Sequence, residues 1–321
     1  MHPKTGTRMP ANIQISQEVR QALELRLPVV ALESTVITHG LPYPENLKLA
    51  RDMEAEVSRG EAVPATVGVI EGVVRVGLQE EHLEMLSQGG ALHKISVRDF
   101  APAIAFKWSG GTTVAGTMLA AYAAGIRVFA TGGIGGVHRE VVGETSRQSA
   151  DISADLPQLS KTPMIVVCAG AKAILDLPAT LEYLETASVP VVGFGTSEFP
   201  AFYSRESGLP TSIRAEDARE VVEIAEAQWS LGLKSALLVV VPPPEEDALP
   251  RPEVDRAIQQ ALQEAYQEGV RGQEVTPYLL ARVAGLTGGG SLKANLSLLR
   301  NNARIATQIA REIARRQQKT V

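Results

Sequence analysis

The run Pro28-Val-Val-Ala-Leu-Glu33 is apolar without alternation and ends at a carboxylate. A strand that is buried on both faces has this pattern, as in parallel sheets that helices cover on both sides. Residues 44–58 follow with apolar side chains at helical spacing, and Gly60 ends this segment. The order of strand and helix predicts the first unit of an α/β layered fold.

The same alternation continues along the chain. Further buried strands are expected at 126–130, 164–168, 189–194 and 236–241. Further helices are expected at 112–124, 215–231, 253–267, 277–284 and 291–316. Two apolar runs, 65–70 and 73–78, flank Glu71-Gly72 and predict a hairpin. The chain is therefore expected to form an α/β fold with a mainly parallel sheet, which the hairpin makes mixed.

The sequence shows no internal repeat and no long linker that would mark a domain boundary. We therefore expect a single α/β domain over residues 15–321. Residues 1–14 are expected to form a flexible N-terminal extension.

Composition limits the class of protein. Of the 321 residues, 45% are hydrophobic and 21% are charged, which is ordinary for a globular protein and argues against disorder. The formal net charge of −5 argues against nucleic-acid binding through a basic surface. The one cysteine, Cys168, excludes an intrachain disulfide and a multi-cysteine zinc site. Since the sequence has neither a signal-peptide pattern nor a run of ~20 apolar residues, we expect a cytoplasmic protein without membrane or nucleic-acid partners.

Glu33 comes directly after the first buried strand. In open α/β sheets, ligands collect beyond the carboxyl ends of the strands, so this carboxylate is a candidate general acid whose pKa burial would raise. The alternative is a carboxylate that accepts backbone N–H hydrogen bonds at the end of the strand. The residues alone leave both interpretations open.

A glycine-rich segment, Thr131-Gly-Gly-Ile-Gly-Gly-Val-His138-Arg139, follows the strand expected at 126–130. Closely spaced glycines let backbone N–H groups approach an anion, and a phosphate is the usual occupant. The spacing fits neither the dinucleotide fingerprint nor the P-loop. Substrate binding here, with Thr131, Gly132 and His138 as candidates, stands beside the alternative that the glycines serve packing alone.

Two aspartates, Asp151 and Asp155, are spaced as i and i+4 and would lie on one face of a helical turn. Carboxylates with water completing the shell suit Mg²⁺ or Mn²⁺ rather than zinc. The alternative is that these aspartates cap the start of a helix.

Two lysines are candidates for cationic roles. Lys172 follows the strand expected at 164–168 among small residues, and a neutral lysine there can act as a nucleophile through a Schiff base. Lys94 is better suited to holding a phosphate. For Lys172 the alternative is an ordinary solvated side chain, because most lysines are exposed.

Four long motifs carry a resemblance to a known family. They are Ala31-Leu-Glu-Ser-Thr-Val-Ile-Thr-His-Gly40, Thr131-Gly-Gly-Ile-Gly-Gly-Val-His-Arg139, Asp151-Ile-Ser-Ala-Asp-Leu156 and Val167-Cys-Ala-Gly-Ala-Lys172. With them the chain resembles pseudouridine-5′-phosphate glycosidase, a family also described as indigoidine synthase A-like. The resemblance extends from about residue 15 to residue 313 and continues through Thr276-Pro-Tyr-Leu-Leu-Ala-Arg-Val283.

The resemblance implies a three-layer α/β/α fold around a mixed, mainly parallel sheet. It also implies a lyase of nucleotide catabolism that reversibly cleaves the C–C glycosidic bond of pseudouridine 5′-phosphate to uracil and ribose 5-phosphate. Members of the family are expected to be homotrimers with one Mn²⁺ ion per subunit.

The resemblance also assigns roles to individual positions. Lys172 matches the Schiff-base nucleophile, Glu33 matches the proton donor, and Asp151 matches the position that binds Mn²⁺. Substrate-contacting positions are matched by Lys94, Val114, Ser153, Ala154 and Asp155. The segment 140–150, directly before Asp151, is longer than expected for the family.

Two other classes of protein stay open at this point. A sugar kinase or other phosphoryl transferase is suggested by the glycines and the aspartates, although no P-loop is visible. A non-catalytic phosphosugar-binding protein would bind the ligand without turnover. ATP dependence tests the first class, and release of uracil tests the second.

Overall fold

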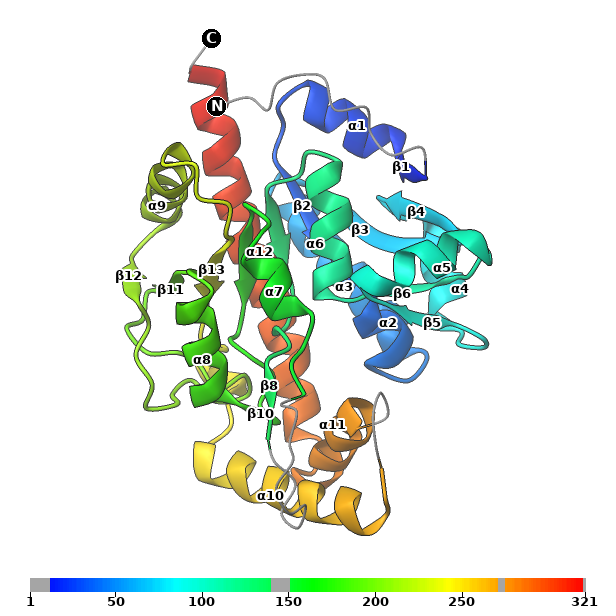
Figure 1. The fold of residues 1–321 in the computed structure, drawn as a ribbon, viewed down its shortest axis with the longest axis vertical. Helices are drawn as coiled ribbons and strands as arrows, with labels where there is room; N and C mark the ends of the chain where they lie inside the picture. The colour runs from blue at the N-terminus through cyan, green and yellow to red at the C-terminus, as the bar shows by residue number, and fades with distance from the viewer. Residues whose placement is uncertain (1–11, 140–150, 271–274, 320–321) are drawn as a thin grey trace.

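The structure, a computed structural model, describes residues 12–139, 151–270 and 275–319. In these residues the main sheet has 11 strands (Figure 1). Its path runs through β1 (Ile13–Ile15), β4 (Val73–Val76), β3 (Val63–Ile70), β2 (Val29–Leu32), β7 (Val128–Ala130), β9 (Ile165–Cys168), β13 (Leu237–Val240), β11 (Val191–Phe194) and β12 (Ile213–Ala215). β6 (Gly110–Thr112) pairs with β3, and β5 (His93–Ile95) pairs with β6.

Most neighbouring strands of this sheet are parallel. The parallel pairs run from β3 through β2, β7, β9, β13 and β11 to β12. β3 is antiparallel to β4 and to β6, so the hairpin expected around Glu71-Gly72 is confirmed. A separate antiparallel pair, β8 (Val137–His138) and β10 (Leu175–Asp176), lies beyond the sheet. The expected mixed, mainly parallel sheet is confirmed.

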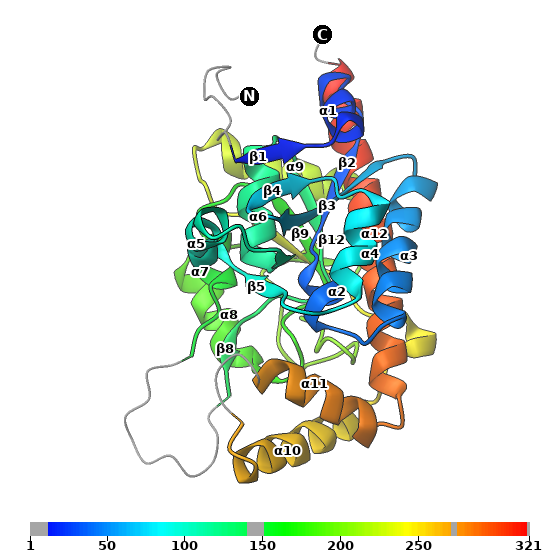
Figure 2. The ribbon, with the colours of Figure 1, turned by 90° about the vertical axis from the view of Figure 1, so that its right-hand side faces the viewer.

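Helices cover both faces of the sheet (Figure 2). On one face α12 (Gly290–Lys319) packs against β2, β7 and β9 and contacts α3 (Glu45–Arg59) and α9 (Ala218–Ser230). On the other face α6 (Val114–Ala123) packs against β2 and β3, with α7 (Asp155–Leu159) beside it. The three-layer α/β/α architecture is therefore confirmed.

Further helices surround these layers. They are α1 (Gln17–Glu24), α2 (Thr35–His39), α4 (Glu80–Ser87), α5 (Phe100–Ala105), α8 (Leu177–Thr186), α10 (Arg251–Gln267), α11 (Val275–Leu286) and the 3-10 turns Val97–Asp99 and Glu245–Asp247. α10 and α11 pack against each other at the lower end of the molecule in Figure 1, beyond the carboxyl ends of the central strands. Within the described ranges, no helix has the length and apolar character that a bilayer crossing requires.

The core lies between the central strands and α12. All four residues of β2, β9 and β13 are buried, as the unbroken apolar runs predict. Leu299, Ala303, Ala306 and Ala310 of α12 are also buried, and their spacing places them on one helix face. The helix expected at 291–316 is confirmed, and this buried stripe shows which of its faces packs on the sheet.

The sequence pattern does not predict the short strands at the edge of the sheet. β1, β5 and β6 have three residues each, too few to show a period of two. β1 pairs with β4 in parallel, with Ile13 opposite Val74, so Ile13 and Gln14 belong to the sheet rather than to the expected extension 1–14. Residues 1–11 of that extension lie outside the described residues.

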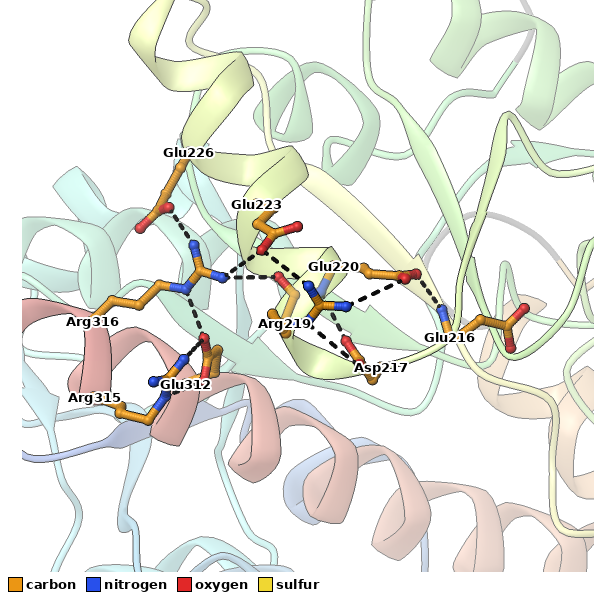
Figure 3. Close-up of polar contacts among 9 residues, drawn as sticks. All are labelled: Glu216, Asp217, Arg219, Glu220, Glu223, Glu226, Glu312, Arg315 and Arg316. Atoms are coloured by element: carbon orange, nitrogen blue, oxygen red, sulfur yellow. Dashed lines mark hydrogen bonds and ion pairs between the residues drawn. The ribbon is translucent and has the colours of Figure 1, made fainter.

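Ion pairs fix the C-terminal part of α12 to α9 (Figure 3). Arg316 binds Glu223 at 3.0 Å and Glu226 at 2.9 Å on α9, and Glu312 at 2.7 Å on its own helix. Arg315 also binds Glu312, at 2.7 Å. Hydrogen bonds from Arg315 and Arg316 lower the pKa of Glu312 to about 2. These contacts connect the two helices on one face of the sheet.

Glu312→Gln is expected to lower the free energy of unfolding at pH 7 by about 1 kcal/mol. Because the pKa of Glu312 is lowered by folding, its contribution is fully present above the unfolded pKa and is lost as the pH falls toward about 2. Urea unfolding of both proteins at several pH values between 7 and 3 measures this difference. A difference that stays constant over this range would contradict the account.

Candidate active site

Polar residues that follow three parallel strands meet at a cavity of about 330 Å³. Glu33 follows β2, Gly132 follows β7 and Lys172 follows β9, while Lys94 lies in β5. The carboxyl ends of parallel strands lie at one edge of a sheet, and this brings together residues that are far apart in the sequence. These four predicted site residues therefore line one cavity.

Elements beyond the sheet complete the cavity wall. α2 with the loop after it, a segment around Phe202, α11 and the first turns of α12 contribute. Their lining residues are Thr35, Val36, His39, Gly40, Leu41, Pro42, Gly133, Phe202, Tyr203, Thr276, Pro277, Leu280, Ala281, Ala284, Ser291, Leu292, Asn295 and Leu299. This wall is mostly apolar and carries a few hydroxyl and amide groups, as in sites that bind small molecules.

Glu33 is a carboxyl group with 6% of its surface exposed. Burial raises its pKa, because the charged form loses its hydration. The positive charge of Lys172 and the hydrogen bond that Thr131 Oγ1 donates to Glu33 Oε1 oppose this rise. A raised pKa keeps the proton on Glu33 over a wider pH range, which suits a proton donor. Thr131 itself is buried and contacts Glu33 without lining the cavity.

Lys94 and Lys172 are half-buried beside Glu33. Burial lowers the pKa of Lys94, and the charge of Lys172 lowers it further, whereas Asp155 and Glu33 act in the opposite direction. Among the residues that the structure describes, neither lysine forms an ion pair within 4.0 Å; Lys293 is the lysine that does. Two lysines without a paired carboxylate leave the cavity with positive charge to offer an anionic ligand.

Asp155 connects the glycine-rich segment with the start of α6. Its carboxylate accepts hydrogen bonds from the backbone N–H groups of Ala115, at 2.9 Å, and Gly135, at 2.8 Å. It is 5% exposed and does not line the cavity, although its charge reaches Glu33 and Lys94. The role of Asp155 in this structure is to hold two segments of the site together.

Three other predicted contacts lie next to Asp155. Val114 begins α6 and is buried, Ser153 Oγ accepts the backbone N–H of Asp155 at 3.3 Å, and Ala154 is exposed before α7. None of the three lines the cavity. They adjoin the site through Asp155.

Asp151 does not share a helix face with Asp155, and that expectation is wrong. α7 begins at Asp155. The carboxylate of Asp155 accepts N–H groups that are distant in the sequence and does not cap α7. Asp151 precedes the helix and is exposed. Its carbonyl accepts the N–H of His138, which lies in β8 and not at the cavity. The segment 140–150 lies outside the described residues.

Asp151 offers a single carboxylate to a metal ion. Within the described ranges, no three His, Cys, Asp or Glu side chains gather into a group that could hold one. Mg²⁺ and Mn²⁺ prefer oxygen ligands, and Mg²⁺ commonly keeps several waters while one or two carboxylates bind it. The donor set therefore fits a largely hydrated divalent ion and does not fit zinc.

In the glycine-rich segment, some glycines are required for close packing, and others have backbone N–H groups without a hydrogen-bond partner among the described residues. A Cβ on Gly133 would lie 2.6 Å from the ring of Phe202, and Cβ atoms on Gly135 and Gly136 would lie even closer to Ser153 and Thr180. The N–H groups of Gly132 and Gly133 form no hydrogen bond within the described part of the chain, and both residues line the cavity. The predicted anion site is therefore limited to these two N–H groups.

Sequence reasoning missed His39, which shows no metal-ligand spacing. His39 lines the cavity, with its Nδ1 2.6 Å from Thr38 Oγ1. Burial lowers its pKa, and the charges of Lys94 and His93 lower it further. His39 follows the same strand as Glu33, six residues later, and this position could have indicated that it lies at the site.

Known proteins that are similar to this chain identify its family. A family model described as "Indigoidine synthase A like protein" matches residues 18–312. The chain belongs to this family. This match confirms, over most of the chain, the resemblance to the indigoidine synthase A-like family.

Relatives in this family are similar over nearly their full length. The pseudouridine-5′-phosphate glycosidase of Caldanaerobacter subterraneus subsp. tengcongensis is 52% identical over 298 residues, 93% of this chain and 95% of that protein. The protein of the same name from Chloroflexus aurantiacus is 54% identical over 306 residues, 94% of this chain and 99% of that protein.

Solved structures agree with the family. The prealnumycin C-glycosynthase AlnA in complex with ribulose 5-phosphate is similar with a TM-score of 0.87 and 41% identity, over 97% of this chain and 99% of that chain. An indigoidine synthase A-like protein from Thermotoga maritima is similar with a TM-score of 0.84 and 36% identity, over 94% and 96% of the two chains.

Gly133→Ala is expected to lower the free energy of unfolding by about 1–3 kcal/mol, because the new methyl group would meet the buried ring of Phe202. Gly285→Ala is the matched control, since Gly285 lies in α11 with open space around its Cβ position. That variant is expected to be as stable as the wild type or more stable by about 1 kcal/mol. Urea unfolding measures both; a wild-type midpoint for Gly133→Ala would contradict the packing account.

Proposed function

We propose that this chain is a pseudouridine-5′-phosphate glycosidase. It would cleave the C–C glycosidic bond of pseudouridine 5′-phosphate reversibly, as a lyase, and release uracil and ribose 5-phosphate. The observation that carries the proposal is the meeting of Glu33, Lys94 and Lys172 at one cavity. Relatives of this name, which are identical to this chain at more than half of the aligned positions, support it, as does the similarity to a C-glycosynthase crystallised with a sugar phosphate.

The bond to be broken explains why a lysine is needed. Ordinary glycosidases protonate a leaving oxygen and let an oxocarbenium ion form. In pseudouridine the leaving atom is C5 of uracil, which has no lone pair to protonate. A route through a covalent adduct supplies the missing electron sink.

In this route the amine of Lys172 attacks C1′ while the bond from C1′ to the ring oxygen breaks. Glu33 gives its proton to the departing ring oxygen, which becomes a hydroxyl group. The attack leaves a positive charge on the adduct nitrogen, which then loses a proton and regains its lone pair. This lone pair expels uracil from C1′ while one proton goes to uracil C5, and an imine forms between Lys172 and C1′. Water hydrolyses the imine and releases ribose 5-phosphate.

The phosphate group has candidate partners on the same cavity. Lys94 offers a charge, and the N–H groups of Gly132 and Gly133 offer hydrogen bonds. Binding energy from this remote group would hold C1′ against Lys172, so the free nucleoside should react poorly.

Asp151 would hold the Mn²⁺ ion, one per subunit, through its exposed carboxylate. The ion would supply positive charge to order an anionic substrate. The family resemblance further supports a homotrimer that acts in the cytoplasm in nucleotide catabolism; light scattering of the purified protein measures the first of these.

Lys172→Ala is expected to lower the rate of uracil release from pseudouridine 5′-phosphate by roughly 10⁴-fold or more, because no other group forms the adduct. Borohydride treatment during turnover should attach the sugar to the wild-type protein and not to the variant. Lys161→Ala, which removes an exposed lysine, is the control and should keep both properties. An adduct of equal yield in Lys172→Ala would remove Lys172 from this role.

Chelation is expected to suppress uracil release, and added Mn²⁺ is expected to restore it. Asp151→Asn should raise the Mn²⁺ concentration needed for half of the full rate by about tenfold or more, because a carboxylate ligand is replaced by a neutral amide. Titration of the metal-free protein with Mn²⁺ measures this. Full activity in excess chelator would refute the metal requirement.

A further inference from the structure

A buried asparagine of α12 holds the chain directly after β7. Asn302 has 0% of its surface exposed, and its Nδ2 group donates hydrogen bonds to the carbonyls of Thr131, at 2.8 Å, and Gly132, at 3.3 Å. These two carbonyls lie 171 and 170 residues away in the sequence. One side chain of the C-terminal helix therefore binds two successive peptide groups at the edge of the cavity, the second of them together with the backbone N–H of Ala169.

The first of these peptide groups carries the side chain that binds Glu33. The N–H of Thr131 donates to Val167 O at 3.0 Å, its carbonyl accepts from Asn302, and its hydroxyl donates to Glu33. The backbone of Thr131 is thus held on both sides, which fixes the position of the Cβ atom that carries the hydroxyl bound to Glu33.

The same two carbonyls determine the direction of the N–H groups that follow them in the chain. In a planar trans peptide the carbonyl and the following N–H point in opposite directions. The carbonyl of Thr131 accepts from Asn302, and that of Gly132 accepts from Asn302 and from the N–H of Ala169, at 2.8 Å, so the N–H groups of Gly132 and Gly133 point away from these donors. Both glycines line the cavity, and their N–H groups have no partner within the described residues.

The side-chain oxygen of Asn302 shows that its hydrogen-bond capacity is only half used. Asn302 Oδ1 is buried and has no hydrogen-bond partner among the described residues. Its neighbours on the buried face of α12 are apolar, among them Leu298, Leu299 and Ala306. An unsatisfied amide oxygen in such surroundings is unfavourable, so packing alone would favour an apolar residue of the same size.

We infer that Asn302 is a positioning residue for the reaction: through the carbonyls of Thr131 and Gly132 it orients the hydrogen bond to Glu33 and the two N–H groups at the cavity. This inference rests on the proposed function for its kinetic readout. Asn302 does not line the cavity, so it acts through Thr131 and the glycines rather than on the substrate.

The test compares Asn302→Leu, Thr131→Val and the double variant in the pH dependence of kcat/KM for uracil release. The bond from Thr131 lowers the pKa of Glu33, so its loss raises that pKa. Since Glu33 acts in its protonated form, the break in the pH profile that belongs to Glu33 moves to higher pH. Thr131→Val is expected to move it by about one pH unit, and this shift identifies the break.

Asn302→Leu is expected to move the same break in the same direction, and the double variant should show no further movement beyond Thr131→Val. A shared path gives such non-additivity, whereas independent effects add. Asn301→Leu is the matched control: the neighbouring side chain points to Pro242 and Arg304, and its profile should stay that of the wild type. A wild-type profile for Asn302→Leu, or shifts that add in the double variant, would overturn the inference.

Two further measurements keep the test decisive. If Asn302→Leu fails to fold, Asn302→Ala is smaller and also has no donor, so the same shift is expected from it. Calorimetric titration with ribose 5-phosphate reads the orientation of the Gly132 and Gly133 N–H groups without turnover. Asn302→Leu should weaken this binding about tenfold, and equal affinity would count against the inference.

The two proposals can fail separately. A wild-type protein that binds ribose 5-phosphate but releases no uracil would refute the proposed function, and the binding comparison would then decide on Asn302 alone. A wild-type protein that releases uracil while Asn302→Leu behaves as the wild type would refute the inference and leave the proposed function standing.

Discussion

A protonatable carboxyl group buried among lysines is the constraint on which the site depends. Burial disfavours the charged form of Glu33, while Lys172, Thr131 and Lys94 favour it. Asp155 adds a second acid to this group, so two carboxyl groups and two lysines influence one another. The pKa of Glu33 therefore depends on where these charges lie, and a small movement of any of them changes what Glu33 can donate.

The order of the strands in the sheet brings the residues of this cluster together, although they are far apart in the sequence. Parallel strands β2, β7 and β9 are neighbours, so the segments that follow them start at the same edge of the sheet. α12 then crosses these strands on one face, and its first turns reach the cavity while its last turns are fixed to α9 by ion pairs (Figure 3). The site is therefore held from both faces of the sheet.

Regular, fully buried elements were the predictable part of the fold. The central strands are apolar on both faces, and long helices show a periodic apolar stripe, so each carries its own signal. Lys94 could be named by resemblance, but its strand β5 could not, because three residues show no period. The paired aspartates misled for a related reason: a spacing of four implies a shared face only inside a helix, and α7 begins at Asp155.

The sequence by itself determined the layered fold, the family, and Glu33 and Lys172 as residues at strand ends. Only the tertiary structure decided which polar groups share the cavity, that His39 belongs to them, and that Asn302 holds Thr131 from a distant helix. The physical reason is the distance along the chain between the groups that interact. Strand and helix patterns arise from neighbours along the chain, whereas burial, pKa and hydrogen-bond partners at the site depend on groups that only the packing of the layers brings into contact.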